Sequence, residues 1–206
     1  MYWDSKLETI NKEELEALQF KRLIKILKTV TKNVNFYKEK FKAVGISPGD
    51  IKTLADVKKL PFTTGEDLKA TYPDGLLAIK KENVVRLHTS SGTTGKPKAI
   101  FFSARDIDSA AELMARCFVM TGVTRSDVFQ NMMTYGLFTG ALVMHYGAEK
   151  LGVLVIPAGP GNSERQLTLM KDFKTTVVHI TPSYALYFAD FLEKKGISSQ
   201  RYLSLK

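Results

Sequence analysis

The sequence predicts an α/β protein in which a helical N-terminal region is followed by part of a mostly parallel sheet covered by helices. Apolar residues recur at helical spacing between Leu15 and Val30. From Val84 onward, short apolar runs alternate with longer amphipathic stretches. Strands that alternate with helices of this length form parallel sheets covered by helices. We therefore expect a helical region over residues 1–80 and a partial α/β subdomain over residues 81–206.

Helix signals dominate the first region. Asn11, with Glu14 three residues later, resembles a capping box, and the apolar residues of the helix that follows are spaced three or four apart. Thr64 precedes acidic residues and predicts a second, short helix. Pro48-Gly49 and the segment 73–75 predict turns.

The second region predicts alternating elements in chain order. Apolar runs at 84–87 and 99–102 flank a polar loop, and a helix capped by Ser103 extends to about Met120. There follow strands at 127–132, 153–156 and 176–180, and helices at 138–151, from Asn162 or Ser163, and from Thr181 to about Gly196. Ligands of parallel sheets bind beyond the carboxyl ends of the strands. The segments after Met132, Ile156 and Ile180 are therefore the expected site.

Composition excludes several classes of function. The chain has 206 residues, 44% of them hydrophobic and 25% charged, as is ordinary for a globular protein. No apolar run is long enough for a membrane span, and the N-terminus lacks a secretory signal. Cys117 is the single cysteine and no Cys/His cluster has metal-ligand spacing, so we expect no metal site and a cytoplasmic location. The net charge of +9 is spread among acidic residues without a DNA-binding motif, which argues against nucleic acid; an anionic ligand, or a more acidic remainder of the protein, fits it.

The segment 89–98, Thr-Ser-Ser-Gly-Thr-Thr-Gly-Lys-Pro-Lys, is the candidate phosphate loop. Glycines bring backbone N–H groups close to a ligand, and hydroxyl and ammonium groups add donors. A Walker loop does not fit, because only two residues separate Gly92 from Gly95, and no complete Rossmann fingerprint occurs. A polar hairpin loop without a ligand is the alternative.

A second candidate lies between a predicted strand and a predicted helix. Tyr135 and Phe138, with Gly136 and Gly140, could make a flat slot for an aryl group. Core packing, with glycines that allow close helix contact, is the alternative. We expect His88, His145 and His179 to have structural roles.

The whole string from Ser90 to Pro97 resembles the phosphate-loop signature of the adenylate-forming enzymes. Five further blocks, in order, resemble the phenylacetate–CoA ligase family: residues 61–64, 131–140, 145–149, 161–166 and 181–184. The resemblance covers nearly the whole chain. It implies the fold of the large domain of adenylate-forming enzymes, truncated.

The resemblance implies a two-step reaction that uses ATP, Mg²⁺ and CoA. An aryl or arylacetic acid would form acyl-AMP and then acyl-CoA. The residues implied to bind nucleotide phosphates are Ser90, Ser91, Gly92, Thr93, Thr94, Gly95 and Lys96; those implied to border the acid are Met133, Tyr135, Gly136, Phe138 and Gly140. The partners are small molecules, and a homodimer is one option for the full-length form. The family's catalytic lysine is expected beyond Lys206, so the 206-residue chain alone is expected to be inactive.

Two departures bear on the substrate. Relatives commonly have an aromatic residue where this chain has Met133, and often a lysine where it has Gly65. Two alternatives remain open: an enzyme that adenylates a deazaflavin-type cofactor without CoA, and a non-catalytic short paralogue that binds nucleotide.

Overall fold

The computed structural model of the chain describes residues 1–90, 97–198 and 203–206. These residues form two compact units: Ser5–Ala104, here called the helical unit, and Met1–Asp4 with Arg105–Lys206, here called the α/β unit. The expected boundary at 80/81 differs from this division by one hairpin. Strands β1 (Val84–Thr89) and β2 (Ala99–Ser103) belong to the helical unit, because they pair antiparallel with each other and do not join the parallel sheet.

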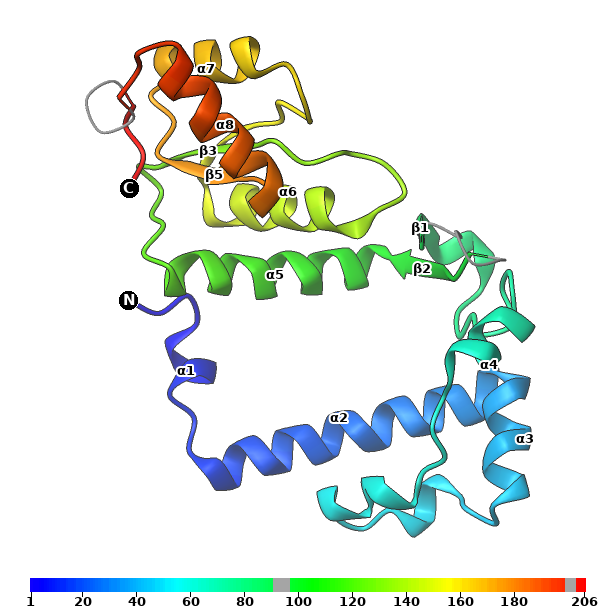
Figure 1. Cartoon of the computed structure of the whole chain (residues 1–206). Helices are drawn as coiled ribbons and strands as arrows, with labels where there is room; N and C mark the ends of the chain where they lie inside the picture. The colour runs from blue at the N-terminus through cyan, green and yellow to red at the C-terminus, as the bar shows by residue number, and fades with distance from the viewer. Residues whose placement is uncertain (91–96, 199–202) are drawn as a thin grey trace. The chain divides into compact units, whose positions relative to one another are not determined.

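The helical unit packs its helices around one small core. Its elements are α1 (Ser5–Glu8), α2 (Lys12–Asn33), α3 (Asn35–Ala43), α4 (Gly65–Ala70) and the 3₁₀ turns η1 (Pro48–Asp50), η2 (Leu54–Lys59) and η3 (Lys81–Asn83) (Figure 1). Leu27, Phe41 and Ile51 form the buried cluster between α2, α3 and the following segment. Asn11 caps α2 by accepting a hydrogen bond from the Glu14 N–H, as the sequence predicts.

The α/β unit contains a three-stranded parallel sheet in the order β4-β3-β5. Its elements are α5 (Ala104–Met120), β3 (Val128–Asn131), α6 (Thr139–Leu151), β4 (Leu154–Ile156), α7 (Ser163–Asp172), β5 (Val177–His179) and α8 (Pro182–Lys194). The predicted strands and helices of this region are confirmed, with ends shifted by a few residues. Thr181 caps α8 by accepting from the Tyr184 N–H, and Gly196 follows that helix with φ +66°. Among the described residues, no helix has the length and apolar run that a membrane crossing needs.

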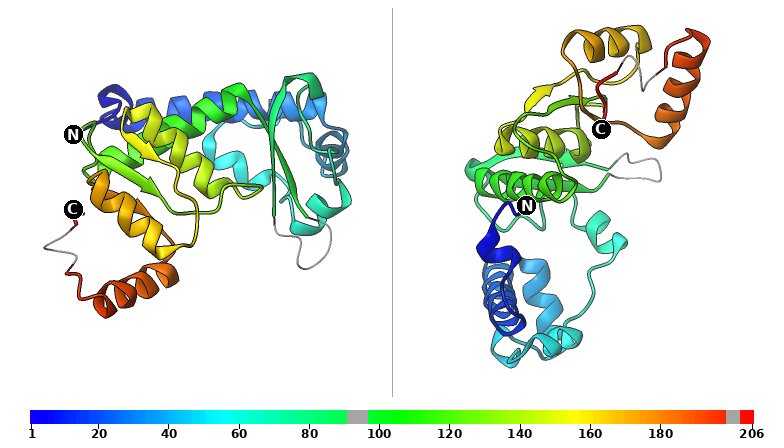
Figure 2. Two further views of the ribbon diagram at one scale, coloured as in Figure 1. Left: turned by 90° about the horizontal axis from the view of Figure 1, so that it is seen from above. Right: turned by 90° about the vertical axis from the view of Figure 1, so that its left-hand side faces the viewer.

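Each face of the sheet carries its own core. Alternate side chains of a strand point to opposite faces. Phe129 of β3 therefore packs with Phe118 of α5 and Ala148 of α6, while Met132 packs with α7 and α8 on the other side (Figures 1 and 2). The central strand β3 is thus covered on both faces.

Asp127, which directly precedes β3, is a buried acceptor of several hydrogen bonds. It accepts from the Thr124 N–H at 2.7 Å and the Thr176 hydroxyl at 2.7 Å, and it pairs with the Lys206 ammonium at 2.6 Å. Burial alone would raise the pKa of Asp127, but the bonds from Lys206, Thr124 and Thr176 outweigh it and lower the pKa to about 2.

This lowered pKa predicts an acid-dependent contribution to stability. A carboxylate whose pKa is depressed by folding stabilises the fold above its unfolded value of 3.8, and the contribution is lost as the pH falls through about 2. We expect Asp127→Asn to lower the free energy of unfolding by about 2 kcal/mol at pH 7. In urea titrations at a series of pH values, the difference from the wild type should shrink between pH 4 and pH 2. A difference that stays constant with pH would contradict this assignment.

Candidate functional site

Three connecting segments meet at the carboxyl edge of the parallel sheet. Gln130 of β3 is in register with Ile156 of β4, and Asn131 with His179 of β5, so the three strands end at one level. The segments that leave them begin within one residue of the expected positions. Parallel topology therefore gathers the β3–α6, β4–α7 and β5–α8 connections at one edge.

The fully buried Asn131 joins all three segments. Its side-chain N–H group donates to the Ala141 carbonyl of α6 at 2.8 Å, and its side-chain oxygen accepts from the Met133 N–H at 3.2 Å. Its backbone carbonyl accepts from the Gly159 N–H at 3.0 Å, and its side-chain oxygen lies 3.1 Å from His179 Nδ1. The sequence places Asn131 in a family-like block but gives it no role. The signal that could have identified it is a polar residue at the end of an otherwise apolar strand.

The Asn131 bonds also fix the tautomer of His179. Because the Asn131 oxygen already accepts from Met133, it acts as the acceptor, and His179 Nδ1–H donates. Burial lowers the pKa of His179, which favours the neutral ring with Nε2 as an acceptor. The ring stacks on Phe129 at 6.2 Å between centroids, consistent with the expected structural role.

The predicted acid-pocket residues lie on the β3–α6 connection and the first turn of α6. Met133 and Tyr135 are partly buried, whereas Phe138 is 63% exposed and directly precedes α6. A Cβ added at Gly136 or Gly140 would meet nothing within 4 Å. These glycines therefore leave open space along the connection, and close helix packing does not explain them.

Tyr135 contacts α6 through both its hydroxyl and its ring. Its oxygen lies 3.1 Å from His145 Nδ1, and the two rings meet edge to face at 5.7 Å and 86°. Burial raises the pKa of Tyr135 to about 12, partly offset by hydrogen bonding with Asn131. The sequence missed this contact, because nothing in residues ten apart marks them as partners.

The β4–α7 connection is held by a second buried polar cluster. Gln166 of α7 donates to the carbonyls of Gly159 at 2.7 Å and Gly161 at 3.1 Å, and its side-chain oxygen accepts from Gln130 at 2.6 Å. The Thr175 hydroxyl donates to the Gln130 oxygen at 2.8 Å. Because each of these buried side chains has a partner, the cluster rigidifies the glycine turn.

The predicted phosphate loop belongs to the helical unit, where β1 and β2 form its base. Ser90 N–H donates to the Lys98 carbonyl at 3.1 Å, and Lys98 N–H donates to the Ser90 hydroxyl oxygen at 2.9 Å. Ser90 thus clasps the two ends of the loop. The other predicted phosphate ligands, residues 91–96, lie outside the described residues.

Lys98 also lies close to Gly65, the first residue of α4. Its ammonium group is 3.8 Å from where a Cβ of residue 65 would stand. Gly65 is the position at which the resemblance leads one to expect a lysine. The chain therefore has a cation beside this position, supplied by another residue.

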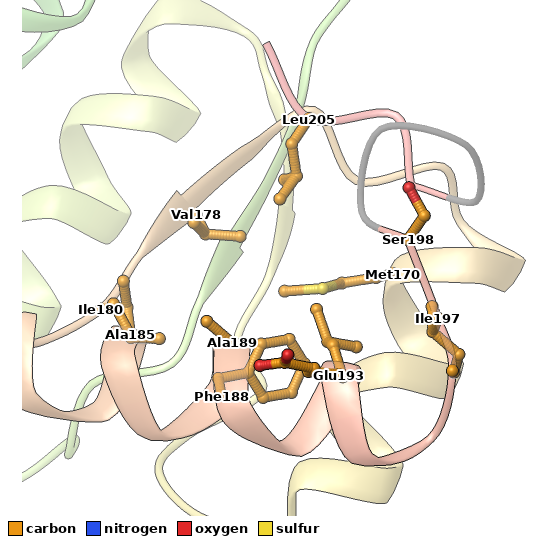
Figure 3. A pocket seen from close by; sticks show the side chains of 12 residues that line it. Met170, Val178, Ile180, Ala185, Phe188, Ala189, Glu193, Ile197, Ser198 and Leu205 are labelled. Atoms are coloured by element: carbon orange, nitrogen blue, oxygen red, sulfur yellow. The ribbon is translucent and has the colours of Figure 1, made fainter.

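An apolar pocket of about 560 Å³ lies between α8, β5 and the C-terminal segment (Figure 3). Val178, Phe188, Leu205 and Met170 line it, with Glu193 and Ser198 among its polar lining residues. None of the predicted site residues lines this pocket. It is therefore separate from the acid pocket that the sequence predicts.

Comparisons with known proteins agree with this arrangement. A family model described as AMP-binding enzyme matches residues 14–206. Proteins named phenylacetate–coenzyme A ligase match at 44% identity over 191 residues in Aromatoleum evansii, covering 93% of this chain and 43% of the relative, and at 40% over 206 residues in Thermus thermophilus, covering 100% and 46%. The chain thus spans under half the length of these relatives.

A solved structure titled as 2-hydroxyisobutyryl-CoA ligase in complex with 2-HIB-AMP and CoA shares the fold. Its TM-score is 0.92 at 25% identity, and the alignment covers 100% of this chain and 45% of that one. The expectation of an adenylate-forming fold is therefore confirmed.

Proposed function

Because this chain belongs to the family of AMP-binding enzymes, we propose that it supplies the phosphate loop and the acid pocket of an AMP-forming acid–thiol ligase. The acid is an aryl or arylacetic acid, activated with ATP to acyl-AMP and transferred to CoA. The observation that supports this most is the 40–44% identity to phenylacetate–coenzyme A ligases across more than nine tenths of the chain.

The proposed division of work follows the two units. Residues 90–96 would hold the β- and γ-phosphates of ATP by backbone N–H groups, hydroxyls and the Lys96 ammonium. Met133, Tyr135, Gly136, Phe138 and Gly140 would border the acid on the β3–α6 connection. Mg²⁺ would arrive with the nucleotide, because the described residues contain no group of three or more His, Cys, Asp or Glu that could hold a metal ion. The cytoplasmic location and the homodimer stay predictions.

Acid-dependent exchange of ATP with pyrophosphate tests the first step. We expect exchange with phenylacetate or a ring-substituted analogue in the longest polypeptide that the gene encodes, and none in the 206-residue chain alone. CoA-dependent release of AMP tests the second step and separates a ligase from an enzyme that adenylates without CoA. Absence of exchange in the longest polypeptide, across a panel of aryl and arylacetic acids, would overturn the proposal and favour a non-catalytic role.

Replacing the loop glycines tests the phosphate site. We expect Gly92→Ala with Gly95→Ala to abolish exchange, because the added Cβ atoms keep the backbone from closing on phosphate. Gly49→Ala is the matched control in the same unit, since its Cβ would make only an ordinary contact at 3.4 Å. Unchanged exchange in the loop variant would remove residues 90–96 from the nucleotide site.

A further inference from the structure

Three side chains of the α/β unit form a continuous polar chain beside the predicted acid pocket. The Tyr135 oxygen lies 3.1 Å from His145 Nδ1, and His145 Nε2 lies 3.0 Å from Glu149 Oε1. His145 and Glu149 are one helical turn apart on α6, so they share a face of that helix. Tyr135 comes from the β3–α6 connection, so the chain joins that connection to the helix.

Hydrogen-bond chemistry assigns a direction to this chain. An ionised carboxylate only accepts, so His145 Nε2–H donates to Glu149. In the neutral imidazole, Nδ1 is then an acceptor, and the Tyr135 hydroxyl donates its proton to it. Glu149 thereby selects the tautomer that binds the phenol.

The Tyr135 hydroxyl has little capacity left for a ligand. Its proton is directed to His145, and the Asn131 side chain also hydrogen-bonds to it. The His145 side chain is only 18% exposed, so water competes poorly for the contact. Next to the ring, Gly136 presents no side chain, and a Cβ there would meet nothing within 4 Å. The ring is therefore the part of Tyr135 that an acid can use.

We propose that His145, oriented by Glu149, is a positioning residue that commits the Tyr135 hydroxyl to the protein, so that the acid contacts Tyr135 through its ring alone. The inference rests on the proposed function and narrows its substrate class. The site would take acids with a flat apolar body at this point, and a hydroxyl on that body would gain nothing from Tyr135.

A double-mutant cycle in the longest encoded polypeptide tests the proposal. We expect Tyr135→Phe and His145→Phe each to raise the KM for the acid about 3- to 10-fold, the size of one net hydrogen bond, with the KM for ATP unchanged. The double variant should be no worse than the worse single variant, because both remove the same interaction. Tyr2→Phe, at an exposed tyrosine of the same unit, should leave both constants unchanged.

Two outcomes would overturn the proposal. If the hydroxyl contacts the acid directly, Tyr135→Phe raises the KM while His145→Phe does not. If the two residues act independently, their effects multiply in the double variant.

A spectroscopic measurement on the 206-residue chain separates this inference from the proposed function. With ¹³Cζ-labelled tyrosine, the Tyr135 signal should shift in His145→Phe and in Glu149→Ala, and should not shift in Tyr2→Phe. An unmoved Tyr135 signal would sink the positioning role whether or not any acid is activated. Loss of exchange with every acid, together with the expected shifts, would instead count against the proposed function alone.

Discussion

Replacing Gly147 with alanine is expected to destabilise the α/β unit by about 3 kcal/mol, at the upper end of what overpacking usually costs. A Cβ at Gly147 would stand 2.2 Å from the Met114 Cβ and 3.1 Å from its backbone carbonyl carbon. Because these atoms belong to the backbone of α5 or are fixed to it, no side-chain rotation relieves the clash. The helices α5 and α6 would have to move apart, and the core that includes Ala115 and Ala148 would open.

Urea unfolding followed by Trp3 fluorescence measures this effect. Trp3 is the single tryptophan of the chain and packs against the same core, so it reports on this unit. Gly140→Ala is the matched control on the same helix, where a Cβ would meet nothing within 4 Å. It should be neutral or slightly stabilising, because alanine favours helix over glycine. Equal effects of the two substitutions would show that the α5–α6 approach is not limited by Gly147.

Replacing Asn131 with leucine is expected to cost about 3 kcal/mol or more and to loosen the whole carboxyl edge. Leucine is of similar size but leaves the Met133 N–H, the Ala141 carbonyl and His179 Nδ1–H without their partner. Each buried group left unpaired costs roughly 1–3 kcal/mol. In the longest encoded polypeptide, the KM for the acid should rise, because the β3–α6 connection loses its anchor.

Asparagine substitutions elsewhere provide the control. Asn33 also donates to a backbone carbonyl, that of Ala78 at 2.9 Å, but it is exposed, so Asn33→Leu should cost less than about 1 kcal/mol. Trp3 fluorescence in urea gives the stability of the Asn131 variant, and ¹H–¹⁵N spectra should show shifted amides at Met133 and Gly159. Shifts confined to the immediate neighbours of residue 131 in sequence would argue against its joining three segments.

The helix caps show how much local sequence determines. Asn11 and Thr181 each accept from the N–H three residues on, as the sequence predicts, because a cap involves only neighbouring residues. The order of strands and helices from Val84 onward follows in the same way from local periodicity. The expected edge of the sheet also follows, since parallel topology alone brings the ends of β3, β4 and β5 together.

The sequence by itself determined the fold class, the order of the elements and the family, since each depends on patterns within a few residues or on an ordered run of motifs. Only the tertiary structure decided which residues hold the candidate site. The Tyr135–His145 bond spans 10 residues, the Gln130–Gln166 bond 36 and the Asn131–His179 bond 48. The folded chain makes these pairs neighbours because burial leaves each polar group to find its partner across the core, and periodicity carries no record of that choice.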